Sequence, residues 1–213
     1  LTKLSHPNIV KYYDSCMQGL PLLIFMEYMN QGSLRQLIDR FGPFKNEIVL
    51  KTIVAKFWQV FNIYTAKKLF TDIKAANILT DQNARIKLSD FGAAKIVEGV
   101  VDLEVSHSGR FFETNQGSLY WMAPEILCGE SYGRRSDIWA LGCTMLEIVT
   151  GKHPWWGVKG FDELKSKLLR QELPRIPPDL SEKAKDFILK CLSHHKSMRP
   201  LAKDLINHPF LTT

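Results

Sequence analysis

The distribution of apolar residues divides the chain into a short strand-rich beginning and a long helical remainder. Two β-branched and aromatic runs, 9–13 and 22–26, flank a turn at 19–21 and predict a pair of strands. Two further strand-like runs lie within residues 78–88, where apolar and charged residues alternate near the end. A few strands followed by many helices predict an α+β fold.

Apolar residues at helical spacing predict helices through the rest of the chain. Ser33 is expected to cap a short helix that contains Leu34, Leu37 and Ile38. A longer helix is predicted over residues 45–64. Beyond Pro124 the periodicity predicts four helices, at 137–149, 161–170, 181–192 and 202–206.

Composition limits the classes of protein to which the chain can belong. Its 213 residues are 45% hydrophobic and 23% charged, which suits one globular domain with a sizeable core. The longest apolar run, 20–26, is too short to span a bilayer. The net charge is +6, but the basic residues are spread along the chain without a nucleic-acid motif. We therefore expect a solvated basic surface rather than a nucleic-acid partner.

The cysteines are Cys16, Cys128, Cys143 and Cys191, which lie far apart and form no C-x-x-C pair. The histidines do not fall at metal-ligand spacings either. This pattern favours reduced thiols in a cytoplasmic protein over a zinc site or a disulfide framework.

Three short motifs occur in a fixed order: D-I-K-A-A-N at 72–77, D-F-G at 90–92 and A-P-E at 123–125. Each motif alone would be weak, because a tripeptide occurs often by chance. Together with D-I-W-A-L-G at 137–142 and R-P at 199–200, they form a specific pattern. Over essentially its whole length, the chain resembles the protein kinase family.

The resemblance implies a kinase-like α+β fold, mostly the helical C-lobe with a two-strand remnant of the N-lobe. Residues 1–29 are expected to form the N-lobe remnant and hinge, and residues 30–211 the C-lobe. The catalytic loop is expected at 70–77 and the activation segment at 90–125. The chain begins inside what resembles the end of the family's αC helix. The family's glycine-rich loop, strand lysine and partner glutamate are therefore not expected among these residues.

The same resemblance implies ATP and Mg²⁺ as cofactors and assigns roles to the motif residues. Phosphoryl transfer mainly requires groups to be positioned and charge to be neutralised. Asp72 matches the carboxylate that accepts the substrate hydroxyl proton, and Lys74 the cation against the γ-phosphate. Ser118 would steady Asp72. Magnesium prefers oxygen ligands, and Asn77 and Asp90 match the family's two ligand positions on separate loops.

A second group of residues resembles the nucleotide site. Met26 matches the gatekeeper, and Glu27 and Met29 belong to the hinge whose backbone hydrogen-bonds adenine. Leu79 matches the apolar residue beneath the adenine ring, and it would serve equally well as ordinary core. Ser33, the predicted helix cap, is also assigned to nucleotide binding.

Several segments resemble one kinase group in particular, the MAP kinase kinase kinases: 4–10, 25–29, 117–122 and 138–144. Lys at position 74 resembles serine/threonine kinases rather than tyrosine kinases. The resemblance implies a protein substrate, such as a downstream kinase, and a cytoplasmic location. The upstream activator is unknown from the sequence.

The resemblance also implies roles in the activation segment. Glu125 and Arg199 match the buried ion pair that ties this segment to the helical lobe. Thr114 resembles the activation-loop phosphorylation site, and Leu119 replaces the family's usual proline, which affects the substrate +1 preference.

Residues 70–71 depart from the family, because Phe-Thr stands where His-Arg precedes the catalytic aspartate. One interpretation is a divergent kinase that lacks the arginine for an activation-loop phosphate, so that phosphorylation at Thr114 would be a weak switch. We favour another hypothesis, that residues 53–71 are translated out of frame. Read one base back, suitable codons for 61–65 spell Gln-Tyr-Leu-His, and suitable codons for 68–72 spell Val-Ile-His-Arg. A gene sequence whose codons at these positions do not allow the shifted reading would exclude the out-of-frame hypothesis.

The alternative to an active enzyme is a truncated or pseudokinase fragment that acts at most as a binding module. The departure at 70–71 and the absent phosphate clamp favour this alternative. The survival of Asp72, Lys74, Asn77 and Asp90 favours the enzyme, because a decayed site would more often have lost one of them.

Overall fold

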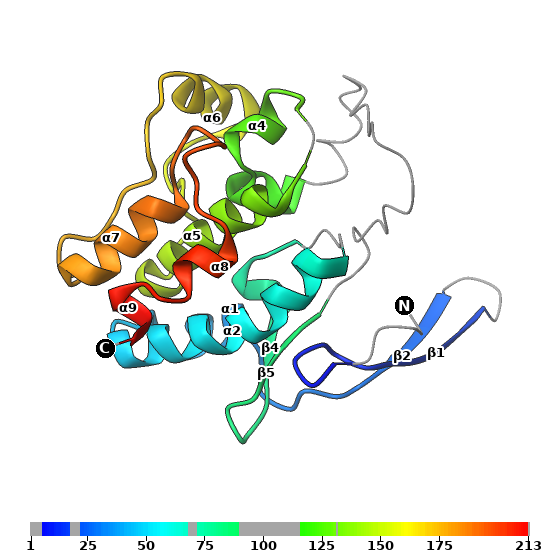
Figure 1. Cartoon of the computed structure of the whole chain (residues 1–213). Helices are drawn as coiled ribbons and strands as arrows, with labels where there is room; N and C mark the ends of the chain where they lie inside the picture. The colour runs from blue at the N-terminus through cyan, green and yellow to red at the C-terminus, as the bar shows by residue number, and fades with distance from the viewer. Residues whose placement is uncertain (1–5, 18–21, 68–71, 90–115, 131, 213) are drawn as a thin grey trace.

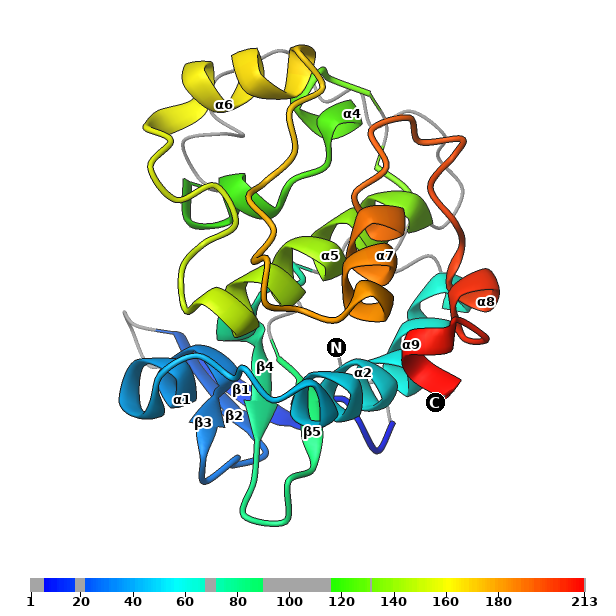
Figure 2. The same ribbon diagram turned by 90° about the vertical axis from the view of Figure 1, so that its left-hand side faces the viewer.

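The computed structural model describes residues 6–17, 22–67, 72–89, 116–130 and 132–212, with only the backbone at 59–67 and 116–117. This part of the chain is mostly helical, and its strands form two small sheets (Figures 1 and 2). Strands come first and helices follow, so the predicted α+β class is confirmed.

The first sheet is an antiparallel ribbon of β1 (Tyr12–Met17) and β2 (Leu22–Met26), which projects from the helices at the lower right of Figure 1. The predicted strand pair is confirmed, but the prediction that the first strand begins at Ile9 is wrong. Ile9 is buried and forms a parallel bridge with Leu88 instead. The start of the apolar run therefore pairs with residue 88, and only its end joins the ribbon.

The second sheet has three antiparallel strands in the order β3 (Gly32–Ser33), β4 (Ile78–Thr80) and β5 (Ile86–Leu88). The two strands predicted within residues 78–88 are confirmed as β4 and β5, with Leu79 opposite Lys87. Strand β3 was not predicted, because two residues carry no periodicity.

The six predicted helices are all present, with ends shifted by a few residues. They are α1 (Leu34–Phe41), α2 (Glu47–Lys67), α5 (Arg134–Thr150), α6 (Gly160–Leu169), α7 (Glu182–Cys191) and α8 (Ala202–Leu205). Four short segments were not predicted: helices α4 (Pro124–Leu127) and α9 (Pro209–Thr212) and the 3-10 turns η1 (Ala75–Asn77) and η2 (Gln116–Trp121). None of the helices in the described ranges is long and apolar enough to cross a membrane.

Ser33 begins α1 as predicted, through a reciprocal pair of hydrogen bonds. Its hydroxyl accepts from the Gln36 N–H at 3.2 Å, and the Gln36 side chain accepts from the Ser33 N–H at 2.9 Å. This capping box satisfies two backbone N–H groups that the helix itself cannot bond.

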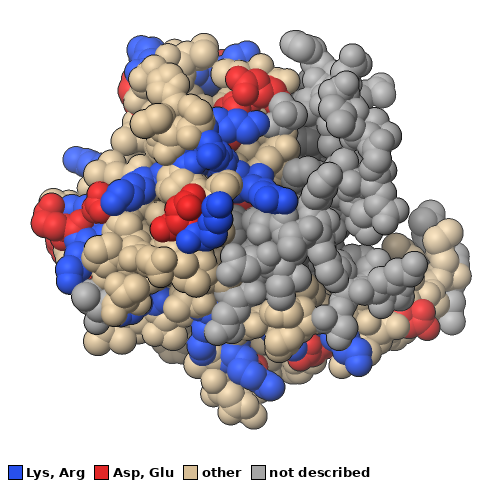
Figure 3. All heavy atoms as spheres, viewed as in Figure 1, with Lys and Arg blue, Asp and Glu red and all other residues tan. Residues whose placement is uncertain are grey.

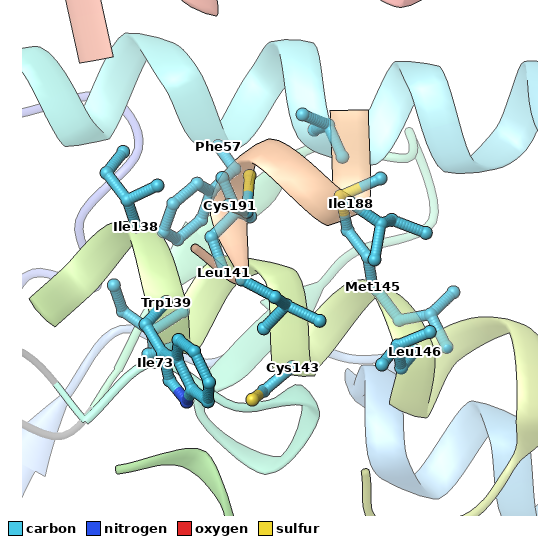
Figure 4. Close-up of a cluster of buried hydrophobic side chains, with 14 of the residues drawn as sticks. Phe57, Ile73, Ile138, Trp139, Leu141, Cys143, Met145, Leu146, Ile188 and Cys191 are labelled. Atoms are coloured by element: carbon cyan, nitrogen blue, oxygen red, sulfur yellow. The ribbon is translucent and has the colours of Figure 1, made fainter. Parts of the chain in front are cut away.

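Helix α5 lies at the centre of the helical part, with α7 beside it (Figure 2). Residues 136–149 are buried without interruption, so the helix is covered on all sides. Figure 4 shows Leu141 and Met145 of α5 among side chains of α2 and α7. Helices α5 and α7 approach closely at Gly142, where an added Cβ would lie 2.8 Å from the Cβ of Cys191. Ile73 of the predicted catalytic loop belongs to the same core, so this segment is anchored on α5.

Candidate active site

The loop that precedes η1 alternates between buried and partly exposed side chains. Ile73 and Ala75 are buried, whereas Asp72 and Lys74 are partly exposed. Extended backbone places successive side chains on opposite sides, so the two charged groups share one side of the loop. The Thr144 hydroxyl of α5 donates to the Ile73 carbonyl at 3.1 Å and fixes the loop to the core.

Asp72, Lys74 and Ser118 form a closed triangle of hydrogen bonds. The Lys74 Nζ lies 2.6 Å from Asp72 Oδ2 and donates to the Ser118 Oγ at 2.6 Å. The Ser118 hydroxyl in turn donates to Asp72 Oδ2 at 2.7 Å. The residues come from two segments more than 40 positions apart. Short charge-assisted bonds of this kind hold a carboxylate in one orientation.

Asn77 adds a fourth side chain to this cluster. Its buried amide nitrogen donates to the Asp72 carbonyl at 2.8 Å and to Asp72 Oδ2 at 3.1 Å. Oδ2 therefore accepts from three side chains, while Asp72 Oδ1 has no partner within the described ranges. The amide oxygen of Asn77 has no partner among the residues that the structure describes, and it is a ligand type that Mg²⁺ accepts.

The second expected metal ligand, Asp90, lies outside the described residues, as do Phe70, Thr71 and Thr114. The predictions for these four positions, including the reading-frame hypothesis, stay predictions. Within the described ranges, no group of three or more His, Cys, Asp or Glu side chains could hold a metal ion.

The predicted hinge, residues 27–29, has the Glu27 side chain and part of its backbone fixed by hydrogen bonds. The Glu27 N–H donates to the Lys11 carbonyl at 2.7 Å, and Gly32 donates to the Met29 carbonyl at 3.0 Å. The Glu27 carboxylate accepts from Lys87 Nζ at 2.7 Å. In contrast, the Glu27 carbonyl and the Met29 N–H have no partner among the residues that the structure describes. These are one backbone acceptor and one donor of the segment expected to bind adenine.

The other residues predicted for nucleotide binding lie near the hinge in different environments. Met26 ends β2 and is 49% exposed, and Leu79 is half-buried on β4, opposite Ser33 of β3. The Ser33 side chain is engaged in the capping box of α1. Their contacts with a nucleotide stay predictions.

Glu147 of α5 is a buried site residue that the sequence motifs did not indicate. Its carboxylate accepts from the Ala75 N–H at 3.0 Å, from Trp121 Nε1 at 3.1 Å and from Arg35 at 3.3 Å. It thereby joins the predicted catalytic loop, η2 and α1 to the central helix. Burial raises the pKa of Glu147 despite these three donors. An acidic residue inside an otherwise apolar helix was the available signal, because such groups are buried only when hydrogen-bonded.

The predicted ion pair between Glu125 and Arg199 is confirmed. Two parallel bonds of 2.8 and 3.0 Å join the guanidinium to the carboxylate, and both side chains are almost fully buried. Arg199 also donates to the carbonyls of Ser193 and Arg135. Burial alone would raise the pKa of Glu125, but Arg199 and Ser136 outweigh it and lower this pKa below its ordinary value.

Comparison with known proteins identifies the family. The model of the protein kinase domain matches residues 1–211. The chain belongs to the protein kinase family. A mitogen-activated protein kinase kinase kinase of Arabidopsis thaliana, ANP1, is 37% identical over 99% of this kinase domain and 31% of its own length. Mitogen-activated protein kinase kinase kinase 1a of Physcomitrium patens is 39% identical over 100% of the domain and 27% of its own length. Mitogen-activated protein kinase kinase kinase A of Dictyostelium discoideum is 35% identical over 99% of the domain and 22% of its own length.

The kinase domain thus spans about a third or less of the length of the curated relatives it matches. The resemblance to MAP kinase kinase kinases stated from the motifs is confirmed over the whole domain.

Proposed function

We propose that this kinase domain transfers the γ-phosphate of ATP to serine or threonine hydroxyls of a protein. The hydrogen-bonded cluster of Asp72, Lys74, Ser118 and Asn77 is the observation that carries the proposal. In this proposal residues 1–29 are the N-lobe part and hinge, and residues 30–211 are the C-lobe.

Asp72 is the proposed base. Three donors hold its Oδ2, which fixes the carboxylate, while Oδ1 remains available to accept the proton of the incoming hydroxyl. The hydroxyl oxygen then attacks the γ-phosphorus as the bond to the β-phosphate oxygen breaks, and ADP leaves.

Lys74 is proposed to neutralise charge on the transferred group. An ammonium has three N–H donors, and two of them are used on Asp72 and Ser118. The third can bond a phosphate oxygen. Because this transition state spreads charge over the phosphoryl oxygens, positioning and neutralisation provide most of the catalysis.

Asn77 and Asp90 are the proposed magnesium ligands, and the free amide oxygen of Asn77 fits this role. When bound, the ion supplies positive charge against the phosphates of ATP. The hinge is proposed to bind adenine through the Glu27 carbonyl and the Met29 N–H, with Met26 as gatekeeper and Leu79 beneath the ring.

The proposed substrate is a kinase of the next tier in a MAP kinase cascade, because the relatives are named as kinases of that tier. We place the activity in the cytoplasm, since all four cysteines are free, as is usual there. On the face drawn in Figure 3, acidic side chains lie among the basic ones, and we propose no nucleic-acid partner.

The test is transfer of radioactive phosphate from ATP with Mg²⁺ to a purified kinase of that tier. The protein should be expressed from its full transcript, whose sequence also settles the frame of residues 53–71. Phosphoamino-acid analysis should give phosphoserine or phosphothreonine. A protein that binds ATP but transfers no phosphate would overturn the enzymatic proposal and favour a binding module.

A further inference from the structure

We infer that Lys87 is a positioning residue of the hinge, acting through the carboxylate of Glu27. The inference rests on the proposed function, because it concerns the segment that would receive adenine. Lys87 lies on β5, 60 positions along the chain from Glu27, and its Nζ is 2.7 Å from Glu27 Oε2.

Lys87 is buried in this ion pair, and Glu27 is partly buried. Lys87 is only 9% exposed, although it alternates with apolar residues on a short strand and could have faced solvent. Lysine is seldom buried unless it is paired, since an isolated ammonium loses its hydration. Burial alone would raise the pKa of Glu27, but the bonds from Lys87 and the Lys11 N–H lower it, so the carboxylate is charged near neutral pH.

Glu27 connects the pair to the neighbouring backbone. Its Oε2 also accepts from the Lys11 N–H at 3.1 Å, while its own N–H donates to the Lys11 carbonyl at 2.7 Å. Lys11 follows a segment that is bonded to β5: the Val10 N–H donates to the Leu88 carbonyl at 2.9 Å. These contacts form a closed circuit from β5 through Lys87, the hinge and Lys11 back to β5.

The circuit fixes Glu27, whose carbonyl has no partner within the described ranges. Lys87 also stands opposite Leu79 in the β4–β5 pair, so it links the hinge to the strand proposed to lie beneath adenine. Lys87 has no contact with Asp72 or Lys74. Its loss should therefore weaken nucleotide binding and leave the phosphoryl-transfer step unchanged.

A purely structural ion pair is the competing explanation, and the same hairpin offers a matched control. Arg85 lies two positions earlier and pairs with Asp81 at 2.6 Å, but its side chain is mostly exposed and does not bond the hinge. Arg85→Met removes a cation and an ion pair without removing any hydrogen bond of the circuit.

The experiment compares Lys87→Met, Lys87→Arg and Arg85→Met in the protein expressed from its full transcript. We expect Lys87→Met to raise the KM for ATP about tenfold, as for loss of a hydrogen bond to a charged group, with kcat within about twofold. Lys87→Arg should recover most of the loss, and Arg85→Met should match the wild type. An unchanged KM, a fall in kcat alone, or an equal loss in Arg85→Met would overturn the inference.

A second measurement needs no catalysis and separates this inference from the proposed function. Without nucleotide, the backbone N–H groups of Lys11 and Glu27 should exchange with solvent faster in Lys87→Met than in Arg85→Met. If the wild type transfers no phosphate, the proposed function fails, and this comparison still decides whether Lys87 positions the hinge. Equal exchange in the two variants would overturn it.

Discussion

Oδ2 of Asp72 accepts hydrogen bonds from three side chains, and Ser118 provides the one that comes from a distant segment. Ser118→Ala removes this donor and leaves Lys74 without its second acceptor. We expect kcat to fall about tenfold or more, the value of one hydrogen bond to a charged group, with an unchanged KM for ATP. Steady-state kinetics of the purified variant measure both.

Ser118→Thr is the matched control, since it keeps the hydroxyl and should keep most of kcat. A full kcat in Ser118→Ala would show that the contact does not position Asp72.

The Glu125–Arg199 pair is a second residue-scale feature, with consequences for stability rather than catalysis. Glu125→Gln leaves the fully buried guanidinium without its counter-charge, so at pH 7 we expect the free energy of unfolding to fall by about 3–5 kcal/mol. The pKa of Glu125 is lower in the folded state than its ordinary value of 4.5. The pair therefore stabilises the protein fully at pH values above 4.5. That contribution is lost as the pH falls through the folded-state value. Urea titrations at pH 7 and below pH 4.5 should show that the wild type and Glu125→Gln differ less in free energy of unfolding at the lower pH.

The exposed pair of Lys190 and Asp186 provides the control for this prediction. Lys190→Met should cost less than about 1 kcal/mol. If the difference in free energy of unfolding between the wild type and Glu125→Gln stays constant as the pH falls, the pKa of Glu125 is not lowered in the folded state.

At the scale of the element, α5 depends on the close approach at Gly142. Replacing glycine by alanine in a helix usually gains about 1 kcal/mol. Here the added Cβ would lie 2.8 Å from the Cβ of Cys191, an atom next to the α7 backbone that cannot move aside easily. We therefore expect Gly142→Ala to lower the free energy of unfolding by about 1–3 kcal/mol in urea titrations.

Gly133→Ala tests the same substitution at the beginning of the same helix. An added Cβ there would meet only the Lys196 side chain, at 3.8 Å. We expect a cost below about 1 kcal/mol, the difference between the two residues at a helix cap. A stabilised Gly142→Ala variant would mean that α5 and α7 can separate without cost.

The elements show how far the sequence could predict the fold. Helix α2 was predictable because its apolar residues repeat at helical spacing over most of its length, whereas α4 has four residues and no repeat. The start of β1 was mispredicted because periodicity shows that Ile9 is buried but not which strand it meets. A partner so distant in sequence is set by the tertiary fold.

The same limit applies to the site. The motifs indicated Asp72, Lys74 and Asn77, because these positions are close together in the chain and fixed in spacing. Glu147 and Lys87 were not indicated, since their partners lie far away in sequence and only the folded chain brings them together. Their signals were a charge within an apolar helix and a charge on a short buried strand.

At the scale of the whole molecule, the β1–β2 ribbon is the least buried part of the described fold. The two strands pair only with each other among the described strands, and every side chain of β2 is exposed. Helix α5, by contrast, is buried from residue 136 to 149. Segments with few buried apolar contacts open at low free energy.

We therefore expect amide hydrogens of the ribbon to exchange through local opening, and those of α5 only through global unfolding. The two opening free energies should differ by about 3 kcal/mol or more in native-state hydrogen exchange. Equal protection of 12–17 and 136–149 would contradict this prediction and mean that the ribbon unfolds together with the helical core.

The most direct test of the proposed phosphoryl transfer is kcat of Asp72→Asn beside the wild type. Asparagine keeps the shape of the side chain but cannot accept the substrate proton. We expect kcat to fall by at least about a hundredfold, the usual contribution of a positioned base, with the KM for ATP and the urea midpoint nearly unchanged. A variant that retains more than about a tenth of the wild-type kcat would contradict the role of Asp72 as the catalytic base.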